Sequence, residues 1–144
     1  MDQDTGVKEL KEYNFYHTVD LPGGIVSEGQ WDHREVIQNY GIPDSLSGKT
    51  AIDVGCRDGF FSFELEKRGA QVTALDVDDR AERRFLAGRL NSKIRFVHEN
   101  IYDFWRHGQR FDLVFCGDVI MHVENPLKLL RCLHEICKGD LILC

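Results

Sequence analysis

The chain has 144 residues, enough for one domain that buries a hydrophobic core. Its formal net charge of -6 argues against a broad positively charged surface that binds nucleic acid. This charge is still compatible with a local basic patch that binds an RNA acceptor. Its cysteines, five in number and without a Cys-x-x-Cys pair, indicate free thiols in a reducing compartment. The polar N-terminus has no signal-peptide pattern and no apolar run is long enough to span a bilayer, so we expect a cytoplasmic protein.

Residues 1–48 are expected to form an N-terminal extension that lies over a functional site. Aromatic residues surround a Pro-Gly-Gly turn in this segment, and they predict irregular structure over residues 13–32. A short helix is expected over residues 33–40. The remaining residues, 49–144, are expected to form the main domain.

Short apolar runs alternate with helical patterns across that domain. Strands are expected at residues 50–54, 71–76, 93–98, 110–116 and 141–143. Helices are expected at residues 60–68, which Gly69 ends, at 79–90, and from Pro126, capped by Asn125, to Gly139. Leucines 127, 129, 130 and 133 are expected to form the apolar face of the last helix. The alternation predicts an α/β fold, a doubly wound and mostly parallel sheet of about five strands with helices on both faces.

The loop after the first strand carries the pattern Gly-x-x-x-Gly. Gly55 and Gly59 allow a tight turn and a close approach of the backbone to a ligand, which binds at the carboxyl ends of such strands. Arg57 stands where dinucleotide-binding loops have their middle glycine, which disfavours a nicotinamide cofactor. Asp53 can orient the loop or meet a ligand's ammonium group. An ordinary glycine turn between strand and helix is the alternative.

Polar residues also follow the second and third strands. Asp76 can accept hydrogen bonds from both hydroxyls of a ribose, and Val77 can pack on an adenine ring. Asn100 is a candidate to bond the adenine edge, with Ile101 against the ring. The alternatives are a solvated acid for Asp76 and a simple Asx turn for Asn100.

These residues, in this order, resemble class I S-adenosylmethionine-dependent methyltransferases over roughly residues 49–144. The matching motifs are Asp53-x-Gly55-x-x-x-Gly59, Asp76, and Phe111-Asp112-Leu113-Val114 with Gly117. The resemblance implies a Rossmann-like methyltransferase fold, S-adenosylmethionine as cofactor, S-adenosylhomocysteine as product, and a small-molecule or RNA acceptor. The cofactor-binding residues expected from the motifs and the loops after the strands are Asp53, Gly55, Cys56, Gly59, Asp76, Val77, Asn100, Ile101 and Gly117.

A narrower resemblance points to the branch that contains the tRNA wobble-uridine carboxymethyltransferases. It is carried by Tyr16-His17, Leu21-Pro22-Gly23-Gly24 and Asp58-Gly59-Phe60-Phe61-Ser62. Met121 stands where those enzymes have a tyrosine, and the sequence has no counterpart of their helical C-terminal domain. We therefore expect generic methyl transfer rather than carboxymethyl transfer.

Methyl transfer from a sulfonium is an in-line displacement that depends mainly on positioning. A base is needed only for a protonated acceptor, and the candidates are His122, Asp118 and His17. For His122 the alternative is a structural hydrogen bond at the start of a helix.

A cofactor-binding subunit or regulator without activity of its own is the main alternative to an enzyme, and a nicotinamide oxidoreductase is a third possible function.

The apolar strand at residues 141–143 lies at a sheet edge, which predicts either pairing with a second copy or a chain truncated from a longer protein. The cysteines and histidines lack ligand-like spacing, so no structural metal is expected.

Overall fold

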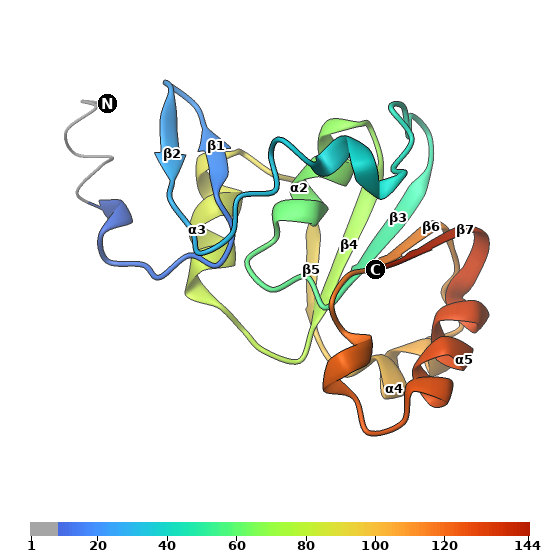
Figure 1. Ribbon diagram of the computed structural model, residues 1–144. Coiled ribbons are helices and arrows are strands. Elements are labelled where there is room, and N and C mark those ends of the chain that lie inside the picture. The colour runs from blue at the N-terminus through green and yellow to red at the C-terminus, as the bar shows by residue number, and fades with distance from the viewer. Residues whose placement is uncertain (1–8) are drawn as a thin grey trace.

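The computed structural model in Figure 1 describes residues 9–144, and the part of the predicted extension before residue 9 lies outside them. A parallel sheet with the order β5-β4-β3-β6-β7 forms the centre of the molecule. Its strands are β3 (Thr50–Val54), β4 (Gln71–Asp76), β5 (Arg95–His98), β6 (Phe111–Cys116) and β7 (Cys137–Leu143). The chain runs outward from β3 to β5 and then returns to β6. This reversal places a topological switch point at the carboxyl ends of β3 and β6, where ligands bind in such sheets.

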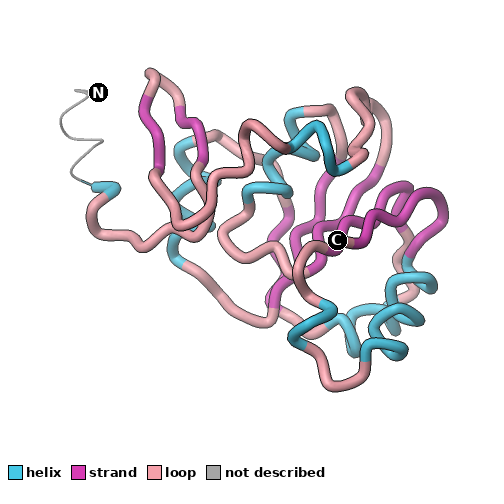
Figure 2. The backbone as a smooth tube through the Cα atoms, viewed as in Figure 1, coloured by secondary structure: helices cyan, strands magenta, loops and turns pink. Residues whose placement is uncertain are grey.

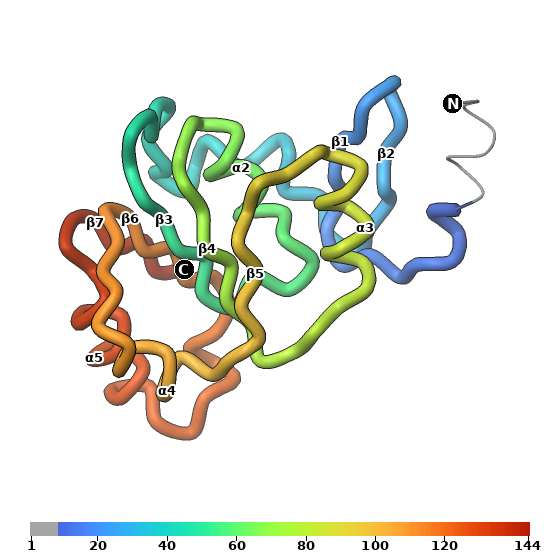
Figure 3. Tube along the Cα trace, turned by 180° about the vertical axis from the view of Figure 1, so that it is seen from behind, coloured from blue at the N-terminus to red at the C-terminus, as the bar shows by residue number. Residues whose placement is uncertain are grey.

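Helices cover both faces of the sheet, as expected (Figures 1 and 3). The helices are α2 (Phe60–Lys67), α3 (Ala81–Arg89), α4 (Ile101–Phe104) and α5 (Pro126–Ile136), with short 3-10 turns η1 (Ile37–Tyr40), η2 (Trp105–His107) and η3 (Ile120–His122). Along β6, Leu113 and Phe115 pack on the side of α2, while Val114 and Cys116 pack on the side of α5. This alternation follows from the two-residue period of a strand. No helix of residues 9–144 is long and apolar enough to cross a membrane.

The N-terminal segment is more regular than its sequence predicts. Strands β1 (Val19–Leu21) and β2 (Ile25–Ser27) form an antiparallel hairpin beside α3, shown as two short magenta strands in Figure 2. The prediction of irregular structure was therefore wrong for these two strands and correct for the rest of residues 13–32, because the glycines only form the hairpin tip, with φ angles of 82° and 73° at Gly23 and Gly24. The helix expected over residues 33–40 is reduced to η1.

The last helix begins as predicted, because the Asn125 side chain accepts a hydrogen bond from the Lys128 amide at 3.0 Å. It does not end at Gly139, which lies inside β7. A Cβ atom on Gly139 would lie 2.2 Å from the Asp112 carbonyl oxygen, where the pairing of β6 and β7 is irregular. This glycine therefore allows close strand contact and does not cap a helix.

Leu127 was also wrongly placed in the buried face of α5, since 77% of it is exposed. The buried positions are Leu129, Cys132, Leu133 and Ile136, which are three or four residues apart. Leu127 is two residues from Leu129 and so lies on another side of the helix.

Candidate cofactor and acceptor site

A cavity of about 460 Å³ lies at the carboxyl ends of the central strands. Of the residues predicted from sequence, those that line it are Asp53, Gly55, Cys56, Asp76, Val77, Asn100, Ile101, Gly117, Asp118, His122 and His17. Gly59 does not line it and instead precedes α2 with a φ of 100°. Loops far apart in the sequence thus meet in one place, because the strands that carry them are parallel neighbours.

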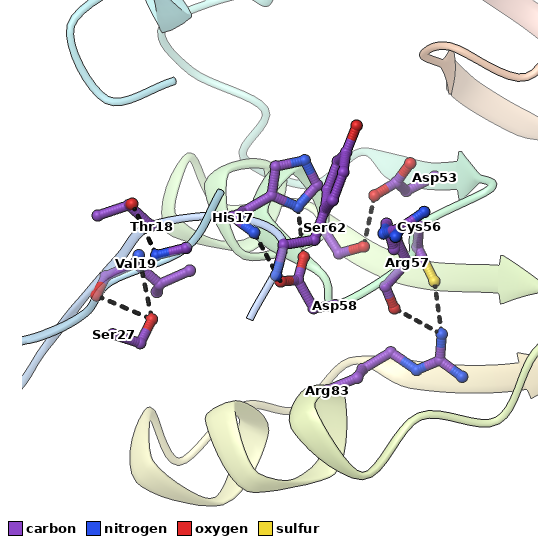
Figure 4. A network of polar contacts seen from close by, with 12 residues as sticks. His17, Thr18, Val19, Ser27, Asp53, Cys56, Arg57, Asp58, Ser62 and Arg83 are labelled. Atoms are coloured by element: carbon purple, nitrogen blue, oxygen red, sulfur yellow. Dashed lines mark hydrogen bonds and ion pairs between the residues drawn. The ribbon is translucent and has the colours of Figure 1, made fainter. Parts of the chain in front are cut away.

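Asp53 is the second-last residue of β3, and its carboxyl group is almost fully buried. The Ser62 hydroxyl donates a hydrogen bond to its Oδ2 atom at 2.6 Å (Figure 4). Burial raises the pKa of Asp53 to about 6, although the Ser62 hydrogen bond opposes the shift. A cation placed in the cavity would stabilise the ionised form, so this acid suits a ligand that carries an ammonium group.

The carboxylate of Asp76 is held by the two loops beside it. The Arg57 amide donates to Oδ2 at 2.7 Å, and the Asp78 amide donates to Oδ1 at 2.9 Å. Each oxygen has a second acceptor direction left over. The carboxylate is thus preoriented at the end of β4, in the cavity wall, and can accept hydrogen bonds from a diol.

Arg83 connects these same two loops and was not identified from the sequence. It is buried in α3, and its guanidinium donates to the carbonyl oxygens of Arg57 at 2.8 Å and Asp78 at 2.9 Å. It also donates to the Cys56 sulfur at 3.2 Å (Figure 4). The only signal in the sequence was its place three residues before Leu86, which puts it on the buried side of the helix.

Gly55 allows the backbone to pass close to the neighbouring loop. Its φ angle is 79°, and an added Cβ would lie 2.3 Å from the Cγ2 atom of Val119. Arg57, in place of the usual middle glycine, also adopts a left-handed φ of 50°. Its guanidinium lies 3.8 Å above the centre of the Tyr16 ring, so the cofactor loop contacts the N-terminal segment.

Asn100 adopts the Asx turn that was its alternative interpretation. Its Oδ1 atom accepts a hydrogen bond from the Tyr102 amide at 2.9 Å and caps α4. The residue nevertheless lines the cavity, and its side-chain NH₂ group makes no hydrogen bond within residues 9–144. Both interpretations of Asn100 are compatible.

His17 is joined to the cofactor loop through Asp58. The amides of Tyr16 and His17 each donate to Asp58 Oδ2 at 2.8 Å, and the His17 Nδ1 atom bonds to Oδ1 (Figure 4). Burial alone would raise the pKa of Asp58, but the contacts with His17 and Tyr16 outweigh it and hold that pKa below the usual value. The sequence pattern shows Asp58 only as part of a motif, because its partners lie far away in the chain.

The other two candidate bases are less firmly held. His122 is exposed on η3, and its ring makes no hydrogen bond to any described residue, so the structural role considered for it is not seen. Asp118 has a φ of 54°, and its amide donates to the Cys144 carbonyl oxygen at 2.7 Å. Within residues 9–144 no group of three or more His, Cys, Asp or Glu side chains could hold a metal ion.

A family model described as "Methyltransferase domain" matches residues 52–143 of the chain. The chain belongs to this family. The predicted class I methyltransferase fold is thereby confirmed, and S-adenosylmethionine is the cofactor that the family implies. The nicotinamide alternative loses its support.

Individual relatives agree with the family. The "Ubiquinone biosynthesis O-methyltransferase" of Vibrio vulnificus (strain YJ016) is 33% identical over 91 residues, 61% of this chain and 39% of that protein. The protein of the same name from Actinobacillus pleuropneumoniae serotype 7 (strain AP76) is 30% identical over 109 residues, 69% of this chain and 46% of that protein. The chain therefore spans less than half the length of these relatives.

A solved structure shows the same arrangement. Magnesium protoporphyrin IX methyltransferase from Synechocystis PCC 6803, crystallised with S-adenosylmethionine, superposes with a TM-score of 0.62 at 26% sequence identity. The match covers 68% of this chain and 49% of that protein.

Proposed function

We propose that the chain binds S-adenosylmethionine in the 460 Å³ cavity and transfers its methyl group to an acceptor at the same opening. The observation that carries the proposal is the convergence of Asp53, Asp76 and Gly117 on one cavity, in a chain of the methyltransferase-domain family. S-adenosylmethionine is an amino acid joined to a nucleoside. The cavity suits such a molecule because it offers a buried acid, a preoriented carboxylate and a backbone that a ligand can approach closely.

Each part of the cofactor has a proposed partner. Asp53 holds the ammonium group, and Asp76 accepts hydrogen bonds from the two ribose hydroxyls. Val77 and Ile101 pack against the adenine, and the free NH₂ group of Asn100 bonds its edge. The backbone at Gly55, Cys56 and Gly117 lies along the methionine portion. When bound, S-adenosylmethionine supplies an electrophilic methyl group, and the chain contributes its orientation and a site that favours loss of positive charge.

The N-terminal extension belongs to this proposed site. Tyr16 and His17 line the cavity, and Arg57 stacks on Tyr16. These contacts support the idea that the described part of residues 1–48 closes over the bound cofactor and faces the acceptor.

A small-molecule acceptor is favoured over RNA. The net charge of -6 gives little electrostatic attraction for a polyanion, and the named relatives act in ubiquinone biosynthesis. The narrower resemblance to tRNA carboxymethyltransferases stays a prediction. Incubation with tritiated S-adenosylmethionine and total tRNA tests it, since label in the RNA would reverse this preference.

Calorimetry with S-adenosylmethionine, S-adenosylhomocysteine and NAD⁺ tests the cofactor. We expect the two adenosyl ligands to bind and the dinucleotide not to bind. Binding of NAD⁺ alone would overturn the proposal. Cofactor binding without transfer to any acceptor would instead support the alternative of a non-catalytic subunit.

Self-association through the sheet edge stays a prediction as well. Within the described residues β7 pairs only with β6, and Leu141 and Leu143 are each about two-fifths exposed on it, at 40% and 39%. Light scattering measures the outcome, and a monomer at micromolar concentration would contradict it. A cytoplasmic location is likewise a prediction, which cell fractionation would test.

A further inference from the structure

The His17 imidazole is fixed at the edge of the proposed site in one orientation. Its backbone amide and its Nδ1 atom both bond to the same carboxylate, that of Asp58. Both residues are buried, with 6% of His17 and 1% of Asp58 exposed. The Nε2 atom has no hydrogen-bond partner in residues 9–144, and His17 lines the cavity. One ring nitrogen is thus fully committed and the other is free to meet a ligand.

This arrangement sets the protonation of the ring. An ionised Asp58 accepts a hydrogen bond from Nδ1, so the neutral imidazole carries its proton there and presents a lone pair at Nε2. The same carboxylate stabilises the imidazolium that forms when Nε2 takes up a proton. A base held in a fixed orientation suits an acceptor group that must lose a proton, such as a hydroxyl.

Aromatic side chains surround His17 on the cavity side. Tyr16, Phe61 and Phe115 line the same cavity, and the rings of Phe61 and Phe115 stack with centroids 4.5 Å apart. The His17 ring lies 4.7 Å from Tyr16 and 5.9 Å from Phe61, edge-on in both cases. Walls of this composition favour a flat aromatic ligand over a flexible polar one.

We propose that His17 is the general base of the methyl transfer, that Asp58 positions it, and that the acceptor is an aromatic ring carrying a hydroxyl group. The inference rests on the proposed function and deepens it by naming the acceptor class. The two other candidates lack the anchoring carboxylate: His122 is exposed without a ring hydrogen bond, and no described side chain holds Asp118.

The proposed step balances without any further reactant. The acceptor oxygen attacks the methyl carbon as His17 Nε2 takes the hydroxyl proton, and a carbon–oxygen bond forms. The carbon–sulfur bond breaks and its electron pair stays on sulfur, which changes from a sulfonium to a neutral thioether. His17 leaves the step as an imidazolium paired with Asp58, and its proton then passes to water.

The test uses catechol as the hydroxylated aromatic probe, tritiated S-adenosylmethionine, and the variant His17→Gln. Glutamine can still bond Asp58 but is no base at neutral pH. We expect calorimetry to give a cofactor Kd within about twofold of wild type, while kcat falls roughly a hundredfold or more. The matched control is His134→Gln on the exposed side of α5, which should leave kcat unchanged.

Each result bears on one statement. Wild-type kcat in His17→Gln would overturn the assignment of the base. No transfer by the wild type to catechol while the cofactor binds would overturn the acceptor class, and 1,2-dimethoxybenzene, which has no hydroxyl group to methylate, gives the blank. If the wild type does not bind S-adenosylmethionine, the proposed function itself is rejected.

Asp58→Asn tests the positioning role through the pH profile of kcat. Groups that face His17 are Asp58, His33 on the N-terminal segment and Asp53 at the end of β3. Removal of the Asp58 charge should shift the rising limb of the kcat profile to lower pH and decrease the plateau value of kcat. Asp58→Glu should partly restore the position of the limb and the plateau value. If both variants lose plateau kcat while the rising limb stays at the wild-type pH, Asp58 has only a structural role. That result would contradict the proposal.

Discussion

Ser62 donates a 2.6 Å hydrogen bond from its hydroxyl to the Asp53 carboxyl group, which is almost fully buried. The hydrogen bonds from Ser62 offset only part of the cost of burying a negative charge, so the pKa of Asp53 stays raised to about 6. The proposed ammonium partner would supply the missing compensation. Cofactor binding and the ionisation of Asp53 should therefore be coupled.

The first prediction is a loss of S-adenosylmethionine affinity at acid pH. The ammonium binds the ionised acid, so the affinity should be constant above about pH 7 and fall by up to about tenfold per pH unit below pH 6. Calorimetry between pH 5 and pH 8 measures it. Asp53→Asn should bind weakly with a flatter pH dependence, and an equally steep dependence in that variant would assign the titration to another group.

The same raised pKa predicts the effect of Asp53 on stability. In the unfolded chain this acid ionises near pH 4, so its contribution makes folding less favourable as pH rises from about 4 to about 6. Asp53→Asn should therefore increase the free energy of unfolding at pH 8 by about 1–3 kcal/mol and have little effect at pH 4. Urea unfolding at the two pH values measures this, and a decrease at pH 8 would contradict the burial argument.

Asp76→Ala should remove most of the affinity for both S-adenosylmethionine and S-adenosylhomocysteine. The variant loses the acceptor for the ribose hydroxyls and also the partner of the Arg57 and Asp78 amides. We expect the Kd to rise roughly a hundredfold, equivalent to about 3 kcal/mol. The control is Asp44→Ala, in an exposed loop. An unchanged Kd in Asp76→Ala would reject the ribose role.

Arg83→Met tests the connection between the two cofactor loops. Methionine keeps much of the apolar volume but leaves the Arg57 and Asp78 carbonyl oxygens without their donor. The free energy of unfolding should fall by about 2–4 kcal/mol, and the cofactor Kd should rise because Asp76 loses its fixed orientation. Thermal unfolding and calorimetry measure the two effects, and Arg83→Lys should recover part of the stability. A Kd equal to wild type in Arg83→Met would show that Arg83 supports only the fold.

The sequence predicted the features that follow from local pattern. Asp53, Asp76 and Gly117 were identified because each lies at or just beyond the carboxyl end of an apolar strand, and parallel strands bring these ends together. The His17–Asp58 pair and the role of Arg83 were not identified, because each depends on contacts between segments that are distant in the chain. Gly139 was misassigned for a related reason, since the contact that requires a glycine is made by another strand.

That contact leads to the last prediction, a pair of glycine substitutions with opposite signs. In Gly139→Ala the new methyl group would collide with the Asp112 carbonyl oxygen at 2.2 Å, and β6 and β7 would have to separate. The free energy of unfolding should fall by roughly 1–3 kcal/mol. In Gly88→Ala the methyl group meets no atom within 4 Å and lies in α3, so helix propensity should raise the free energy of unfolding by about 1 kcal/mol. Urea unfolding of both variants measures the difference. Equal effects would show that β7 adjusts freely and that Gly139 is not required for its pairing with β6.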